Sequence, residues 1–77
     1  MPNITDAVDL ARLRTWTASG RARTIRESAR LSRGDVARSI GVNETTVARW
    51  ELGLRSPTGA AAVRYLELLN ALRSELS

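Results

Sequence analysis

The side chains of this sequence best suited to binding a partner are arginines, and most of them lie in the middle of the chain. All twelve basic residues are Arg, and the net charge over 77 residues is +4. Ten of them lie between positions 10 and 55, where the acidic residues are only Glu27, Asp35, Glu44 and Glu51. The planar guanidinium group suits phosphate oxygens and guanine edges, although a GC-rich coding sequence would also favour Arg over Lys. A polyanion is therefore the natural partner.

The amino-acid composition also argues against an enzyme. The sequence contains no His and no Cys, and it shows neither a Gly-rich phosphate loop nor clustered carboxylates. We therefore expect no catalytic residue, no metal and no cofactor, and a chain this short leaves little room for a small-molecule effector. No segment is long and apolar enough to span a membrane, and the N-terminus does not resemble a signal peptide. The expected location is the cytoplasm of a bacterial or phage-infected cell.

The spacing of apolar residues predicts an all-α fold of five helices, because no stretch alternates as a strand would. Thr5 should cap a first helix that fades near residues 19–20, and a second helix should cover roughly residues 20–29. The last helix is expected over about 57–75, with Pro57 in its first turn. Its apolar side is expected to hold Val63, Leu66, Leu69, Leu72 and Leu76.

Two short helices lie in the centre of the sequence. Ser32 followed three residues later by Asp35 predicts a capped helix over about 32–40. Asn43 predicts the cap of the next helix, over about 44–52.

The turn between these two helices imposes the most specific pattern in the chain. Ala37 allows the helices to approach closely, and Gly41, four residues later, provides the left-handed backbone that the turn needs. The positions that must fill the angle between the helices are all apolar: Val36, Ile40, Val42, Val47 and Trp50. Seven positions thus agree with a helix-turn-helix.

The surface of the second of these helices separates this interpretation from a plain α-hairpin in a bundle. With Val47 and Trp50 facing inward, its outward side holds Thr45, Ala48, Arg49 and Leu52. A bundle surface more typically carries Glu–Lys pairs four residues apart. A short, polar and cationic surface favours insertion into a DNA groove instead.

At these residues the sequence resembles the phage-repressor and Cro-like helix-turn-helix family, also called the XRE family. The matching landmarks are the Leu-Ser-Arg run before the motif, the Val-Ala-Arg-Trp-Glu run with Gly53 after it, and Arg55-Ser-Pro57. The resemblance covers about residues 22–72. Arg33 stands where that family often carries Gln, and Leu52 stands where a polar residue is common.

The resemblance implies a compact lambda-repressor-like bundle that binds double-stranded DNA. The helix over 32–40 would be the positioning helix, and the helix over 44–52 would enter the major groove as the recognition helix. Residues 20–77 would form this domain, and residues 1–19 would be an N-terminal helical addition. The implied function is a sequence-specific transcriptional regulator, such as a Cro-like or small phage- or plasmid-type repressor.

Three residues are expected to read bases. Arg49 is suited to bidentate contact with guanine, with a phosphate contact as the alternative. Thr45 would touch a thymine methyl group or a backbone oxygen. Glu44 would accept from cytosine N4, or would only stabilise the N-terminus of its helix.

Six further residues are expected at phosphates, mainly because helix N-termini and Arg side chains attract them. They are Ser32, Arg33, Asn43, Thr46, Arg55 and Arg26. Asn43 and Thr46 would combine this role with capping. The resemblance also implies that Arg26 pairs with Glu51 in a structural ion pair that orients Arg26 toward phosphate.

Two expectations concern protein partners. An apolar stripe on the last helix, with possible help from Trp16, would join a homodimer: Tyr65, Leu69, Leu72 and Leu76. The alternative places most of this stripe in the domain's own core. The alternative function is an antitoxin-like or regulatory module that keeps the helix-turn-helix and works mainly by binding another protein.

Overall fold

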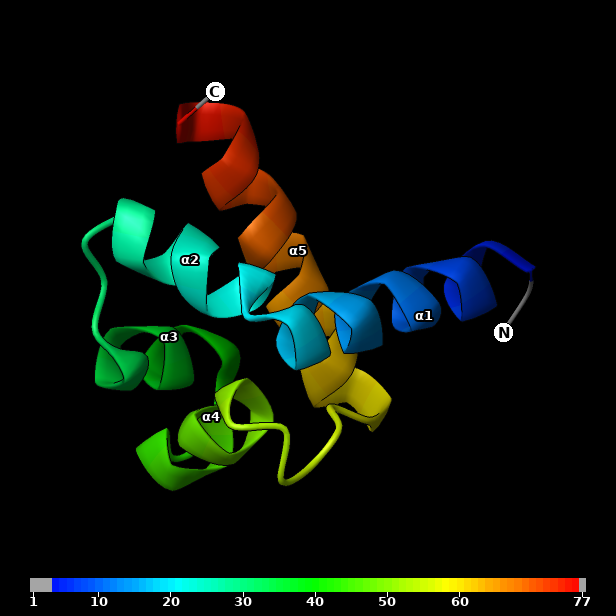
Figure 1. Ribbon diagram of the computed structural model, residues 1–77, viewed down its shortest axis with the longest axis horizontal. Helices are drawn as coiled ribbons and strands as arrows, with labels where there is room; N and C mark the ends of the chain where they lie inside the picture. Colours follow the sequence, from blue (N-terminus) through cyan, green and yellow to red (C-terminus); the bar gives the residue numbers. More distant parts are fainter. Residues whose placement is uncertain (1–3, 77) are drawn as a thin grey trace.

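The computed structural model describes residues 4–76, with side chains described from residue 7 to residue 75. This part of the chain contains five helices and no strand, which confirms the all-α prediction (Figure 1). The helices are α1 (Ile4–Ser19), α2 (Arg21–Ser28), α3 (Arg33–Ile40), α4 (Glu44–Glu51) and α5 (Gly59–Leu76). Among the described residues no helix is long and apolar enough to cross a membrane. Nor do these residues include a group of three or more potential metal ligands.

The predicted starts of the first and last helices were wrong. Helix α1 begins at Ile4, so Thr5 lies inside the helix rather than capping it. Helix α5 begins at Gly59, so Pro57 is outside its first turn. Pro57 is instead fully buried, in the loop that joins α4 to α5. Gly59 has a φ of +64°, which breaks helical geometry between Pro57 and the rest of α5.

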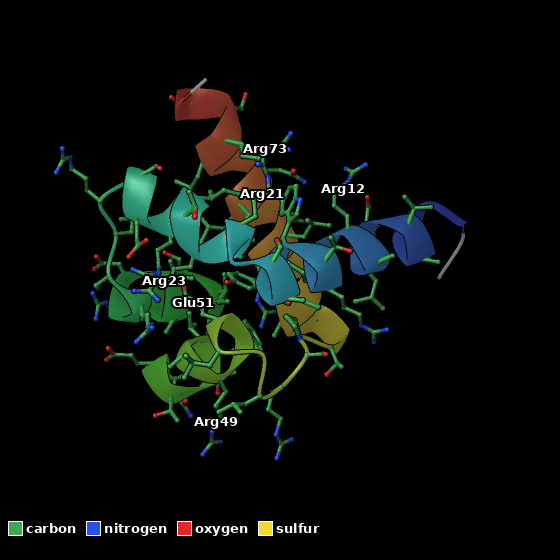
Figure 2. The ribbon with its side chains drawn as sticks, in the orientation of Figure 1. Arg12, Arg21, Arg23, Arg49, Glu51 and Arg73 are labelled. Atoms are coloured by element: carbon green, nitrogen blue, oxygen red, sulfur yellow. The ribbon has the colours of Figure 1, made fainter. Side chains whose placement is uncertain are left out.

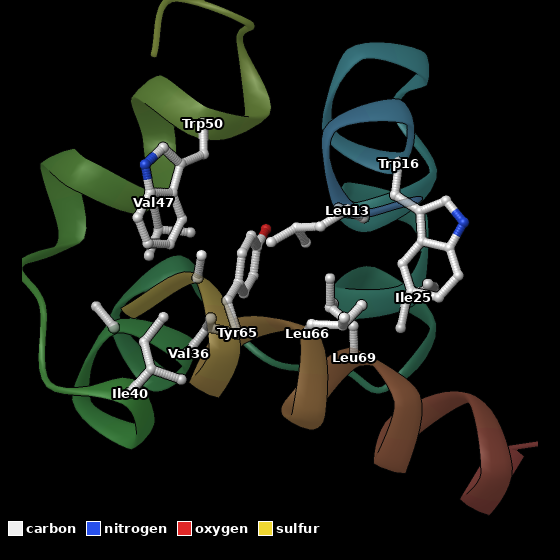
Figure 3. Close-up of a cluster of buried hydrophobic side chains, with 13 residues drawn as sticks. Leu13, Trp16, Ile25, Val36, Ile40, Val47, Trp50, Tyr65, Leu66 and Leu69 are labelled. Atoms are coloured by element: carbon white, nitrogen blue, oxygen red, sulfur yellow. The ribbon is translucent and has the colours of Figure 1, made fainter. Parts of the chain in front are cut away.

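One apolar core joins all five helices (Figure 3). Trp50 of α4 and Tyr65 of α5 pack against each other, with ring centroids 4.8 Å apart. Leu13 and Trp16 bring α1 into the same core, although its first turns extend beyond α5 (Figure 1). The N-terminal helix is therefore packed as part of the bundle rather than as a loose addition.

The packing of α5 removes two of the four residues from the predicted dimer stripe. Tyr65 and Leu69 are fully buried within the chain's own core, and Leu72 is half-buried against it. The side chain of Leu76 lies outside the described residues. Val63, which was expected to face inward, is 58% exposed. The wide apolar stripe is needed because α5 is covered by several other helices, and the alternative assignment to the core was correct for Tyr65 and Leu69.

Candidate nucleic-acid interface

Helix α3 begins at a reciprocal cap, as the sequence predicted. The Ser32 hydroxyl accepts a hydrogen bond from the Asp35 backbone N–H at 2.9 Å, and the Ser32 N–H donates to the Asp35 carboxylate at 2.8 Å. The backbone hydrogen bond from Ser32 holds the pKa of Asp35 below its usual value. Arg38 also pairs with Asp35 at 2.6 Å. This cap fixes where α3 starts and so sets the placement of the helices that follow.

The turn from α3 to α4 is held by one hydrogen bond within the motif and by another from α5. Gly41 adopts the left-handed conformation, with a φ of 76°, and the Val42 N–H donates to the Ala37 carbonyl at 3.0 Å. Arg64 reaches across from α5 and donates through Nε to the Ile40 carbonyl at 2.8 Å. Carbonyls at a helix C-terminus lack partners within the helix, so this contact ties α5 to the motif.

Helix α4 begins at Asn43. Its side-chain oxygen accepts from both the backbone N–H and the hydroxyl of Thr46, each at 2.9 Å. The predicted capping role of Asn43 is confirmed, while the phosphate roles of Asn43 and Thr46 stay predictions. The inward side of α4 carries Val47 and Trp50, both buried as expected.

The outward side of α4 is open. Glu44, Thr45 and Arg49 are exposed, and Leu52 just after the helix is 61% exposed. Arg49 points away from the body of the protein (Figure 2). The three predicted base-reading residues therefore lie on one accessible helix, whose opposite side is anchored in the core.

Glu44 sits close to the start of α3. A Cβ atom added at Gly34 would lie 3.5 Å from the Glu44 carboxylate and 3.4 Å from the Arg38 guanidinium. These two charged side chains thus meet at the first turn of α3, at ordinary van der Waals distance from that position. The carboxylate of Glu44 lies over this turn, near the N-termini of both helices of the motif.

A hollow of about 340 Å³ flanks α4 and brings two predicted contacts together. Arg49 and Arg55 both line it, along with the hydroxyl-bearing residues Thr46, Ser56 and Thr58. Two guanidinium groups and the hydroxyls of Ser56 and Thr58 form a set of donors suited to phosphate oxygens, while the Thr46 hydroxyl already donates to Asn43. The sequence assigned Arg49 to bases and Arg55 to phosphate, and it did not predict that they would share one hollow.

Glu51, at the end of α4, is the acceptor of a buried ionic network. Arg26 binds its carboxylate in a bidentate manner, through Nε at 2.6 Å and Nη2 at 3.0 Å, and Arg33 adds a third bond at 3.0 Å. Burial alone would raise the pKa of Glu51, but the hydrogen bonds from the two Arg side chains outweigh it and lower that pKa. The bond to Glu51 likewise raises the pKa of Arg26. The network links α2, α3 and α4.

This network confirms the Arg26–Glu51 pair, while the phosphate role of Arg26 stays a prediction. The Arg26 side chain is only 10% exposed, and its third nitrogen donates to the Leu31 carbonyl at 2.9 Å. Three of its five N–H donors are thus used inside the protein, which leaves at most one on each terminal nitrogen for a phosphate. Arg33 is 32% exposed and uses only Nε for Glu51, so its predicted phosphate contact stays a prediction.

Two structural contacts were missed by sequence reasoning. The bond from Arg33 to Glu51 spans 18 positions, and the bond from Arg64 to Ile40 spans 24. No local signal marks such pairs. For Arg33 the departure from the family's usual Gln was the available sign that its contact would differ.

Comparison with known families agrees with this geometry. A family model described as helix-turn-helix matches residues 23–76, more than two thirds of the chain. The match starts inside α2 and contains α3, the turn and α4. No curated protein and no solved structure matches the chain. The chain belongs to the XRE-type, Cro-like helix-turn-helix family of DNA-binding regulators.

Proposed function

We propose that this protein is a small Cro-like repressor that reads double-stranded DNA by placing α4 in the major groove. The observation that carries the proposal is the exposed face of α4, where Glu44, Thr45 and Arg49 are presented by a helix fixed from behind. Burial of Val47 and Trp50 and the cap at Asn43 hold that face in place before DNA arrives. A rigid support is what base reading requires, because a small displacement would misalign a bidentate contact.

Phosphate contacts would set the position of the helix on the duplex. Arg33 lies at the start of α3 and reaches Glu51 at the end of α4, and Arg55 lies in the loop that follows α4. Contacts of this kind carry affinity without reading sequence. Arg33 would reach phosphate with the two guanidinium nitrogens that Glu51 does not occupy.

We further propose that two copies bind one operator. A single recognition helix brings only about three or four side chains to base edges, too few to select one site among about a million competitors. The operator would then be an inverted repeat with half-site centres about 10 base pairs apart. Sedimentation with and without operator tests this, and one monomer on one asymmetric site at saturation would contradict it. The burial of Tyr65 and Leu69 excludes those two side chains from the contact between copies.

The experiment that tests DNA binding is a selection of bound sequences from random DNA, followed by affinity measurements over a range of salt. Replacing Arg33 or Arg55 by Ala should weaken specific and non-specific binding alike and reduce the salt slope by about one unit. Arg14→Ala is the matched control, because it removes an equal charge from an exposed position on α1.

An unchanged slope in both variants would refute the phosphate assignments. Absence of any selected sequence, together with salt-insensitive binding to a protein, would favour the antitoxin-like alternative. The two outcomes are distinguishable because contacts through apolar side chains do not release counterions.

A further inference from the structure

A groove of about 640 Å³ lies between α2 and α5. Arg21 of α2 and Arg73 of α5 each contribute a cation to it. Its other lining residues include Ile25, Thr24, Ser28 and Asn70, so polar and apolar groups share the groove wall about equally. The volume falls within the range of small-molecule sites, about 300–1,000 Å³.

Both cations are held by one aromatic ring. The guanidinium carbon of Arg73 lies 5.0 Å from the centroid of Trp16, and that of Arg21 lies 5.8 Å from it. Trp16 is buried in the core and provides a fixed platform. A guanidinium group held on a ring still presents its N–H edges for hydrogen bonding. Both cations therefore line one groove with donors available.

No ion pair among the described residues engages Arg21 or Arg73, whereas Arg23, on the same helix as Arg21, pairs with Glu27. The ion pairs among the described residues engage Arg23, Arg26, Arg33 and Arg38. No described carboxylate lies within ion-pair distance of Arg21 or Arg73. Two like charges gathered on one ring repel each other unless an anion lies between them.

The proposed DNA contact does not account for these cations. Figure 2 shows Arg73 and Arg21 toward one end of the molecule and Arg49, at the recognition helix, toward the other. A duplex seated on α4 would lie away from the groove. The groove is thus a second cationic surface, apart from α4.

We propose that this groove binds a small polyanion, a molecule carrying two or more carboxylate or phosphate groups, between Arg21 and Arg73. Each guanidinium group would donate to one anionic group, and the hydroxyl of Ser28 and the amide of Asn70 would complete the set of polar contacts. The sequence alone predicted no effector because the chain is short. Two helices and one tryptophan are enough to build such a site on its surface.

The test uses the full chain and two probes at constant ionic strength. Citrate represents the carboxylate class and pyrophosphate the phosphate class, and calorimetric titration measures their affinity. We expect saturable one-site binding of at least one probe. Arg21→Gln and Arg73→Gln should each weaken it about tenfold, the loss of one charge-assisted hydrogen-bonding group. Arg14→Gln should change it by less than about twofold, because a distant exposed charge is screened.

The two tryptophans give an internal readout of location. Trp16 and Trp50 lie on opposite sides of the core (Figure 3). In a proton–nitrogen NMR spectrum the indole signal of Trp16 should shift on adding the probe, while that of Trp50 should stay in place. If Arg73→Gln fails to fold, Arg73→Lys keeps the charge but loses the planar fork, and it should still weaken binding.

Three results would overturn the proposal. The first is that neither probe shows saturable binding. The second is that Arg14→Gln weakens binding as much as Arg21→Gln and Arg73→Gln do. The third is that the indole signal of Trp50 shifts on adding the probe while that of Trp16 does not. Operator affinity is measured separately for each variant. A loss of operator binding in Arg21→Gln or Arg73→Gln, with no binding of either probe, would assign the groove to DNA instead. Because the readouts are independent, failure of this site would leave the proposed DNA contact untouched.

Discussion

Replacing Glu51 by Ala removes the carboxylate that receives hydrogen bonds from Arg26 and Arg33. The Glu51 side chain is fully buried and Arg26 is only 10% exposed, so the change leaves an unpaired charge inside the protein. Breaking a buried ion pair in this way costs about 3–5 kcal/mol. At roughly 0.05–0.15 kcal/mol per residue, a chain of this length has an unfolding free energy of about 4–12 kcal/mol. The variant should therefore lose a large share of its stability.

Urea denaturation followed by circular dichroism measures this loss. The matched control is Glu27→Ala, because Glu27 forms an exposed pair with Arg23 at 3.3 Å, in which both side chains are about half exposed. Exposed pairs contribute only about 0–1 kcal/mol. If Glu51→Ala unfolds too readily to measure, Glu51→Gln keeps the volume and removes the charge.

A double-mutant cycle isolates the Arg26–Glu51 interaction. Arg26→Met and Glu51→Leu should each destabilise the protein, while the double variant should recover much of the loss because no charge is left buried. A coupling free energy near zero, or a Glu51→Ala cost no larger than that of Glu27→Ala, would refute the reasoning.

Three further predictions concern stability. The lowered pKa of Glu51 means that the unfolded chain binds the proton more tightly than the folded protein does. The stability that this carboxylate contributes should therefore be full well above the ordinary pKa of 4.5 and should be lost as the pH drops through the lower folded value. Glu51→Gln should flatten this acid dependence, while the part due to Asp35 should remain. The Tyr65 hydroxyl is buried without a hydrogen-bond partner among the described residues. Tyr65→Phe should therefore leave the free energy of unfolding unchanged or raise it by about 1 kcal/mol. A clear loss of stability in urea denaturation would show that the hydroxyl is hydrogen-bonded. Arg64→Ala should lower stability by about 1 kcal/mol through the lost bond to the end of α3, and a thermal melt equal to that of Arg14→Ala would contradict this.

The helix-turn-helix could be predicted from the sequence because its determinants are local. Ser32 and Asp35 cap one another across three positions, and Asn43 caps α4 in the same way. Gly41 adopts the left-handed backbone that a turn of this kind demands. Caps and turns depend on nearest neighbours, so residue type and spacing are sufficient to place them.

The role of α5 could not be predicted in the same way. A helical stripe shows which residues share a side, but it does not show what covers that side. Leu69 is fully buried and Trp50 lies against Tyr65, so the chain itself occupies positions that were assigned to a dimer. Long-range polar contacts could not be predicted from the sequence either, since nothing near Arg64 in the sequence indicates a hydrogen bond to the Ile40 carbonyl.

The most direct test of the account is whether Arg49 reads a base. Affinity would be measured by fluorescence anisotropy for wild type and Arg49→Ala on the selected operator and on each single base-pair variant of it, with Arg14→Ala as the control of equal charge. The account predicts a loss of about 1–3 kcal/mol on the preferred operator and loss of discrimination at one G·C pair, with discrimination elsewhere retained. An equal loss on every sequence would contradict it, and would assign Arg49 to phosphate in the hollow it shares with Arg55.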